Sequence, residues 1–199
     1  MTELYDILRK RLGEGITDID FSVLTCAGVE YRMNDFVLTE STDGSDTVIS
    51  GINPDISISW LFKSCEDRCL ISLSCITALP ITRITNLHLR YSRPELKDWR
   101  ALADGLDMYK DTGIQTLSQI EGREVKCSFL GLFPDSQRKG LFITSLIPNK
   151  HRHEYTLTFS DGIAELSSVT SFPRGFTGEW CSETTWVASS KSILDSIDD

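Results

Sequence analysis

The sequence has no long apolar run. None of its 199 residues lies in a stretch close to the roughly 20 apolar residues that a membrane-spanning helix requires. Its start, MTELYDILRKRLGEG, also lacks the apolar core and the small-residue cleavage site of a secretory signal. We therefore expect a cytoplasmic protein that makes no membrane contact.

Positive charge is scarce. Twenty lysines and arginines stand against 29 aspartates and glutamates, so the formal net charge is −9. Such a surface repels phosphate backbones, which argues against nucleic-acid binding. It favours attraction to a basic surface, so the expected partner is another protein with such a surface. The composition leaves the oligomeric state open.

Sequence signatures of catalysis are missing. The chain contains no G-x-S-x-G turn, no G-x-x-x-x-G-K-[ST] loop, no G-x-G-x-x-G and no H-E-x-x-H. The acidic stretch TDGSDT does not have the ligand spacing of a calcium loop. We therefore expect a protein that is not an enzyme, with no catalytic residue, metal site or cofactor. A triad assembled in space would need one of only three histidines.

Cysteines are few for a disulfide scaffold of this length. The spacing of Cys65, Cys69 and Cys75 does not match a zinc site, and no second pair completes one. In a cytosol the six cysteines are expected to be reduced, and most of them to be small buried groups. A redox-reactive pair is the alternative.

Alternating strands are the clearest positive signal. DISISWLF places Ile56, Ile58, Trp60 and Phe62 on one face, with serines on the other. LISLSCITAL and NLHLRY repeat the pattern, and in NLHLRY it leaves His88 and the following arginine on the solvated face. Sheets with one solvated face are typical of antiparallel pairing.

Three segments have helical features. Residues 2–12 carry an apolar stripe and end at a glycine, and residues 184–197 show a weaker stripe. In residues 92–109, Ser92-x-x-Glu95 has the form of a capping box before apolar residues at helical spacing. The predicted fold is a single α+β domain over residues 1–199. It has an antiparallel sheet, two or three helices, and a possible inserted loop at residues 161–183.

The stretch PNKHRHEYTLTF holds two of the three histidines. On a strand, His151 and His153 share a face with Tyr155, whereas Glu154 lies on the other face. We therefore expect the histidines at the edge of the core, with no polar group reaching them. Two imidazoles without a third ligand do not make a metal site. A small hydrolase that uses His151 or His153 as general base is the alternative function.

The stretch SFPRGFTGEW combines aromatic residues with an arginine. Such residues dominate binding hot spots, and an apolar loop must fold back on its domain or meet a partner. Folding back is the more frequent outcome. Contact with a partner is the functional prediction, and it assigns partner binding to Phe172, Arg174, Phe176 and Trp180.

The order of elements resembles a known family. The segments PELKDWRALADGLDMYK, QIEGREVKCSFL, GLFITSLI with HEYTLTF, and SILDSI resemble the C-terminal half of PsbP-like and DcrB-like domains. These are α+β sandwiches, and some bacterial members act as adaptors or chaperones of type VI secretion. The resemblance implies architecture only, and residues 161–183 depart from it.

The function expected from the sequence is binding without catalysis. The protein would be an adaptor or chaperone, or an immunity or inhibitor protein linked to a bacterial secretion or toxin system.

Overall fold

Thirteen antiparallel strands dominate the part of the protein that the structure describes. The computed structural model describes residues 15–44, 46–65, 68–105, 113–134, 140–145, 152–182 and 184–190. The strands are β1 (Ile16–Thr25), β2 (Glu30–Arg32), β3 (Val37–Asp43), β4 (Asp46–Asn53), β5 (Ile56–Cys65), β6 (Arg68–Ser92), β7 (Arg100–Gly105), β8 (Gly113–Thr116), β9 (Glu124–Phe133), β10 (Gly140–Ser145), β11 (Arg152–Ser160), β12 (Ile163–Cys181) and β13 (Thr185–Ser190). The helices in this part of the chain are three short 3-10 turns, η1 (Met33–Asp35), η2 (Leu96–Asp98) and η3 (Leu117–Ile120).

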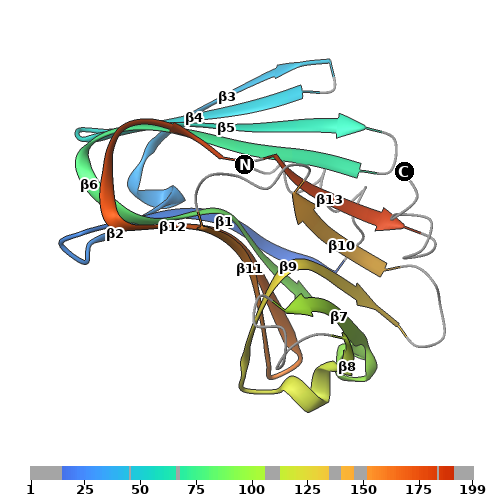
Figure 1. The fold of residues 1–199 in the computed structure, drawn as a ribbon. Coiled ribbons are helices and arrows are strands. Elements are labelled where there is room, and N and C mark those ends of the chain that lie inside the picture. Colours follow the sequence, from blue (N-terminus) through green and yellow to red (C-terminus); the bar gives the residue numbers. More distant parts are fainter. Residues whose placement is uncertain are drawn as a thin grey trace.

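Two long strands connect two layers. The first half of β6 pairs with β5, and its second half pairs with β1 and with the start of β12. Figure 1 shows β3, β4 and β5 in one layer and β1, β11 and β12 in the other, with β6 and β12 curving between them. The bend in β6 lies near Pro80, whose carbonyl accepts a hydrogen bond from the Cys26 N–H at 2.8 Å. A proline cannot donate to the strand ladder, which suits a bend.

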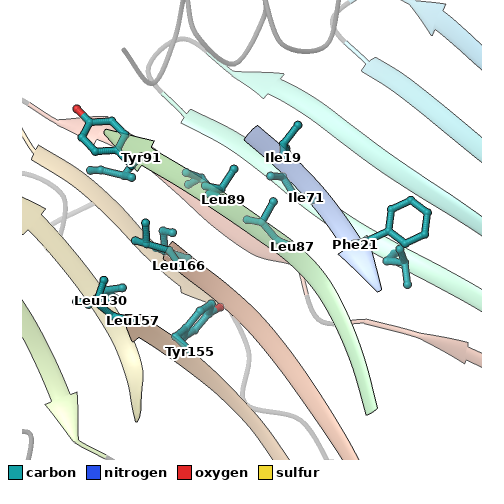
Figure 2. Close-up of a cluster of buried hydrophobic side chains, with 14 of the residues drawn as sticks. Ile19, Phe21, Ile71, Leu87, Leu89, Tyr91, Leu130, Tyr155, Leu157 and Leu166 are labelled. Carbon is teal, nitrogen blue, oxygen red and sulfur yellow. The ribbon is translucent and has the colours of Figure 1, made fainter. Parts of the chain in front are cut away.

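Six of the strands form a closed ring. The hydrogen-bonded order is β12-β11-β9-β10-β13-β6, and β6 pairs again with β12. The core lies between the layers and inside the ring. Figure 2 shows part of it, including Ile71, Leu87, Tyr155 and Leu157. Closing the ring pairs the edges of all six strands and removes open edges there.

The strand predictions based on alternation are confirmed. Ile56, Ile58, Trp60 and Phe62 are all buried, and the pairing of β5 with β6 is antiparallel. In NLHLRY, the leucines and Tyr91 are buried while His88 lies on the opposite face and is half-buried.

The α+β prediction is wrong. Residues 92–109 contain η2 followed by β7 as far as residue 105, and the rest of that segment lies outside the described residues. The apolar spacing fits both structures, because Trp99, Ala101 and Ala103 are buried at every second position. Ser92 does not cap a helix there; its hydroxyl donates to the Gly162 carbonyl at 3.3 Å.

Three further predictions concern two segments at the ends of the chain and one loop. The predicted helix at residues 2–12 lies outside the described residues. Residues 185–190 form β13, paired with β6 and β10, where the start of a C-terminal helix was expected. Within residues 161–183, the possible inserted loop, residues 163–181 form β12. None of the helices in the described ranges has the length and apolar character needed to cross a membrane.

Candidate functional site

A polar groove lies on the face of β1, β6 and β12 that points away from the core. Along β1, Ile19, Phe21 and Val23 are buried in the core, while the alternate residues Asp20 and Ser22 are half-buried on the other face. The hollow has a volume of about 210 Å³. This is below the roughly 300–1,000 Å³ of pockets for drug-sized ligands, so it suits a smaller ligand. Its lining comprises Asp20, Phe21, Ser22, Glu30, Arg32, Arg83, Thr85, His88, Glu124, Thr156, Thr158, Glu165 and Ser167.

Strand register places the polar side chains in rows across the sheet. Asp20 of β1 is opposite His88 of β6, and His88 is opposite Ser167 of β12. Ser167 is opposite Thr156 of β11, which is opposite Lys126 of β9. Directly opposed side chains have Cβ atoms about 4.5–5.5 Å apart. The row therefore brings five side chains from five strands into one continuous surface.

His88 is a neutral imidazole at the centre of this surface. Burial lowers the pKa of the His88 imidazole, although Glu165, Asp20 and Asp18 act in the opposite direction. Its Nδ1 atom is 2.9 Å from the Ser167 hydroxyl. Because one nitrogen is engaged by the sheet, the other is the nitrogen available to a ligand in the groove.

Asp20 is held by the backbone. One carboxylate oxygen accepts hydrogen bonds from the Phe21 N–H at 2.8 Å and from the Met33 N–H at 3.2 Å. The turn η1 supplies the Met33 N–H. Burial raises the pKa of the Asp20 carboxyl, and these two hydrogen bonds oppose the rise. The result is a carboxylate with a fixed orientation and increased basicity.

Ion pairs fix most of the other charges around the groove. Arg32 lies 3.1 Å from Glu30, and Arg90 lies 3.1 Å from Glu165. Burial alone would raise the pKa of Glu30, but hydrogen bonds from Ser22 and Arg32 outweigh it, and the pKa is lowered.

Lys126 is shared by two carboxylates, Glu154 at 3.0 Å and Glu124 at 3.6 Å. Arg83 lines the groove without an ion pair to any described carboxylate. The described residues contain no group of three or more His, Cys, Asp and Glu that could hold a metal ion.

His153 lies on the other face of the sheet, away from the groove. The prediction that it shares the core face with Tyr155 is confirmed, and the two rings meet edge to face with centroids 5.0 Å apart. The prediction that no polar group reaches it is wrong. Its Nδ1 is 3.1 Å from the Thr170 hydroxyl and its Nε2 is 3.3 Å from the Ser168 hydroxyl.

The described hydrogen-bond partners of His153 argue against the alternative function, a hydrolase that uses this residue as general base. They are hydroxyls, whereas that hydrolase requires a carboxylate or thiol beside the imidazole. Burial lowers the pKa of His153 to about 4, so the ring is neutral. His151 lies outside the described residues.

The four predicted partner-binding residues lie on β12. Phe172 and Trp180 are buried, Phe176 is half-buried against the core, and Arg174 is exposed. The Phe172 ring stacks on Phe176 with centroids 5.3 Å apart and meets Trp180 at 5.6 Å. The aromatic rings thus pack on one another and on the domain. The assignment of partner binding to these residues stays a prediction.

The residues of the groove were missed by sequence reasoning. The alternation in NLHLRY correctly placed His88 on a solvated face, but it carried no signal of what lies beside it. The neighbours Asp20 and Ser167 are 68 and 79 positions away in the chain. Only the register of β1, β6 and β12 brings them together.

Comparison with known proteins gives a fold without a sequence family. No protein-family model matches the sequence, and no curated protein is significantly similar to it. Among solved structures, the fold is similar to a variant of the GH36 α-galactosidase AgaA from Geobacillus stearothermophilus in complex with 1-deoxygalactonojirimycin. The TM-score is 0.57 at 8% identity, over 88% of this chain and 30% of that one. The chain therefore spans about a third of that enzyme.

Two other similar structures match over most of their length. A galactose mutarotase related enzyme from Lactobacillus acidophilus gives a TM-score of 0.55 at 7% identity, over 86% of this chain and 79% of that one. A galactose mutarotase-like protein from Lactobacillus casei gives 0.52 at 8% identity, over 84% and 80%. At these identities the similarity shows the fold alone.

The comparisons correct three predictions. The similar structures are galactose mutarotase-like folds, so the resemblance to PsbP-like and DcrB-like domains is wrong. The predicted adaptor, chaperone, immunity or inhibitor protein linked to secretion or toxins is also wrong. So is the prediction that the protein is not an enzyme, because the fold is similar to those of an α-galactosidase and of a galactose mutarotase related enzyme.

Proposed function

We propose that the groove binds an uncharged sugar and catalyses the interconversion of its two anomers. The observation that carries the proposal is the position of His88 directly opposite Asp20 in a polar groove. The fold supports it, because two of the similar structures are described as related to galactose mutarotase, and mutarotation is this reaction.

Interconversion of anomers needs a base and an acid at one sugar ring. The base removes the proton of the anomeric hydroxyl, and the acid gives a proton to the ring oxygen. The bond between the anomeric carbon and the ring oxygen then breaks, leaving an open-chain aldehyde. After rotation about the neighbouring bond, the reverse transfers close the ring on the other face. Both protons return, so no oxidant, reductant or cofactor is consumed.

Asp20 and His88 have the properties that these two roles require. Asp20 is a carboxylate whose pKa is raised by burial, which brings it closer to the operating pH of a base. The neutral His88 imidazole offers an N–H to the ring oxygen of the sugar; transfer of this proton leaves an imidazolate, which regains the proton when the sugar ring closes. Their opposed positions on β1 and β6 allow one sugar ring to meet both groups.

The charges of the groove favour an uncharged ligand. Four carboxylates and two arginines line it, so an acidic or phosphorylated sugar meets a net negative surface. The guanidinium of Arg83, which forms no ion pair with a described carboxylate, offers a fork of N–H donors to neighbouring sugar hydroxyls.

The test is the rate at which pure α-D-galactose or α-D-glucose reaches anomeric equilibrium, followed by polarimetry. We expect acceleration by the wild-type protein, and a loss of roughly 100-fold or more in kcat for both His88→Gln and Asp20→Asn. Asp43→Asn, at the exposed end of β3, is the matched control and should retain full activity. A wild-type rate equal to that of buffer would refute the proposed catalysis, even if a sugar binds.

We also propose that the protein acts in the cytoplasm. The exposed Cys26 and Cys181 form no disulfide bond within the described part of the chain, as is usual in reducing compartments. A protein partner with a basic surface stays a prediction. The exposed Arg174 is itself positively charged, so it does not complement such a surface.

A further inference from the structure

We propose that Ser167 is a positioning residue that determines which nitrogen of His88 carries the proton. Its hydroxyl donates a hydrogen bond to Nδ1, so that the ring proton lies on Nε2, the nitrogen available to the groove. The catalytic meaning of this arrangement rests on the proposed function, whereas the arrangement itself does not.

The contact is built into the sheet. Ser167 and His88 are opposed residues of β12 and β6, and the Ser167 hydroxyl lies 2.9 Å from Nδ1. The next residue, Ser168, points to the core and is fully engaged there by His153 and Thr185. The two neighbouring serines therefore act on opposite faces of β12, each beside one histidine.

Two directions are open to the Ser167–His88 hydrogen bond. If Nδ1 carries the proton, the ring donates to Ser167 and Nε2 is a bare base. If Nε2 carries the proton, the Ser167 hydroxyl donates to Nδ1 and the ring offers an N–H to the groove. The charges that face the ring decide between these two tautomers.

Carboxylates dominate the surroundings of His88. The negative charges of Glu165, Asp20 and Asp18 act on the ring against the positive charge of Arg32. Asp20 on β1 lies on the side of His88 that is turned away from Ser167 on β12. Negative charge attracts an N–H and repels a lone pair. The side of the ring towards the groove therefore carries the proton, which leaves the Nδ1 lone pair to accept from Ser167.

This tautomer fits a division of labour with Asp20. A neutral imidazole with Nε2–H can donate to the ring oxygen of a sugar while Asp20 remains the base. Without the Ser167 hydroxyl, either nitrogen can carry the proton and the ring can rotate. In metal sites, removing the group that orients a histidine ligand typically lowers metal affinity or activity by about 10–100-fold.

The direct test is the ¹⁵N spectrum of the histidine side chains at neutral pH. The chain has only three histidines, so the difference between wild type and His88→Gln assigns the signals of His88. We expect a pyrrole-type Nε2 and a pyridine-type Nδ1 in the wild type, and mixed tautomers in Ser167→Ala. A pyridine-type Nε2 in the wild type, or unchanged signals in Ser167→Ala, would overturn the proposal.

Kinetics supply a second, separate arm. Ser167→Ala should lower kcat about tenfold with little change in KM, and Ser167→Thr, which keeps a hydroxyl, should restore most of the rate. Ser57→Ala, an exposed serine on β5, is the matched control. Full activity in Ser167→Ala would refute the positioning role. Absence of any wild-type activity would refute the proposed function. The ¹⁵N spectrum would still test the tautomer of His88, because it does not depend on activity.

Discussion

Five polar side chains form a continuous hydrogen-bonded chain inside the closed ring of strands. The Asn86 amide donates to the Thr185 hydroxyl at 3.1 Å, and Thr185 lies 3.0 Å from the Ser168 hydroxyl. Ser168 in turn reaches His153 Nε2, and His153 Nδ1 reaches Thr170. A hydroxyl can both donate and accept, so the chain satisfies a neutral imidazole on both nitrogens. A charged imidazole would be costly in the same place.

The first consequence is a loss of stability in acid. Burial lowers the pKa of His153 from 6.5 to about 4, so the unfolded chain binds its proton at a higher pH than the folded one. The free energy of unfolding is therefore fully present above pH 6.5 and falls as the pH is lowered towards 4. Over that range His153 accounts for a loss of about 3 kcal/mol, at 1.36 kcal/mol per pKa unit.

Urea unfolding at pH 7 and pH 4.5 measures this loss. In His153→Gln the difference between the two pH values should shrink by most of that amount, whatever the variant costs at pH 7. The same pH difference is measured in His88→Gln as a comparison. The pKa of His88 is also lowered by burial, but His88 is less buried than His153. Equal pH dependence in wild type and His153→Gln would contradict this account of the core.

Strand β13 contributes one residue, Thr185, to the hydrogen-bonded series of polar side chains described above. It pairs with β10 on one side and with the first part of β6 on the other, which completes the ring. Its first residue, Thr185, is fully buried and links Asn86 of β6 to Ser168 of β12. The hydroxyl of Thr185 thus joins β13 to β12, the strand before it, and to β6, whose Asn86 is 99 positions away in the chain.

Thr185→Val tests that link. The substitution preserves the shape of the side chain but leaves the buried Asn86 amide without its acceptor. We expect the free energy of unfolding to fall by about 1–3 kcal/mol, measured by urea unfolding. Thr39→Val, on the exposed face of β3, should change it by less than about 0.5 kcal/mol. A cost for Thr185→Val as small as that of the control would show that the link contributes nothing.

Elements were predictable from the sequence where only one periodicity fitted. In β5 and in both halves of β6, apolar residues alternate with serine, arginine or histidine, which a helix does not explain. In residues 96–103, Leu96, Trp99, Leu102 and Ala103 fit a helical stripe as well as a strand. Tertiary pairing of β7 with β8 and β9 decided in favour of the strand.

At the scale of the whole molecule, the groove arises from topology. Its central row takes residues from β1, β6, β12, β11 and β9, in that order across the sheet. Of the strands that are neighbours in this row, only β11 and β12 are consecutive in the sequence. The sequence supplies the alternation that puts His88 on an outer face. It contains no local pattern for the register that sets Asp20 and Ser167 on either side, so the site could not be predicted.

Part of the acidic composition is located at the groove in the folded chain. The net charge of −9 suggested a basic protein partner, yet four of the carboxylates line the groove. There Glu30 pairs with Arg32 and Glu165 pairs with Arg90, while Glu165 and Asp20 oppose the lowering of the His88 pKa. The partner with a basic surface stays a prediction.

The most direct test of the account is a chemical-shift map of the ¹⁵N-labelled protein titrated with D-galactose and D-glucose. The account predicts saturable shifts that cluster at the groove, with His88, Ser167 and Asp20 among the most affected. Residues of β3 and β4 in the opposite layer should not move. No shift at sugar concentrations up to the solubility limit, or shifts confined to β3 and β4, would contradict the claim that this groove is a sugar site.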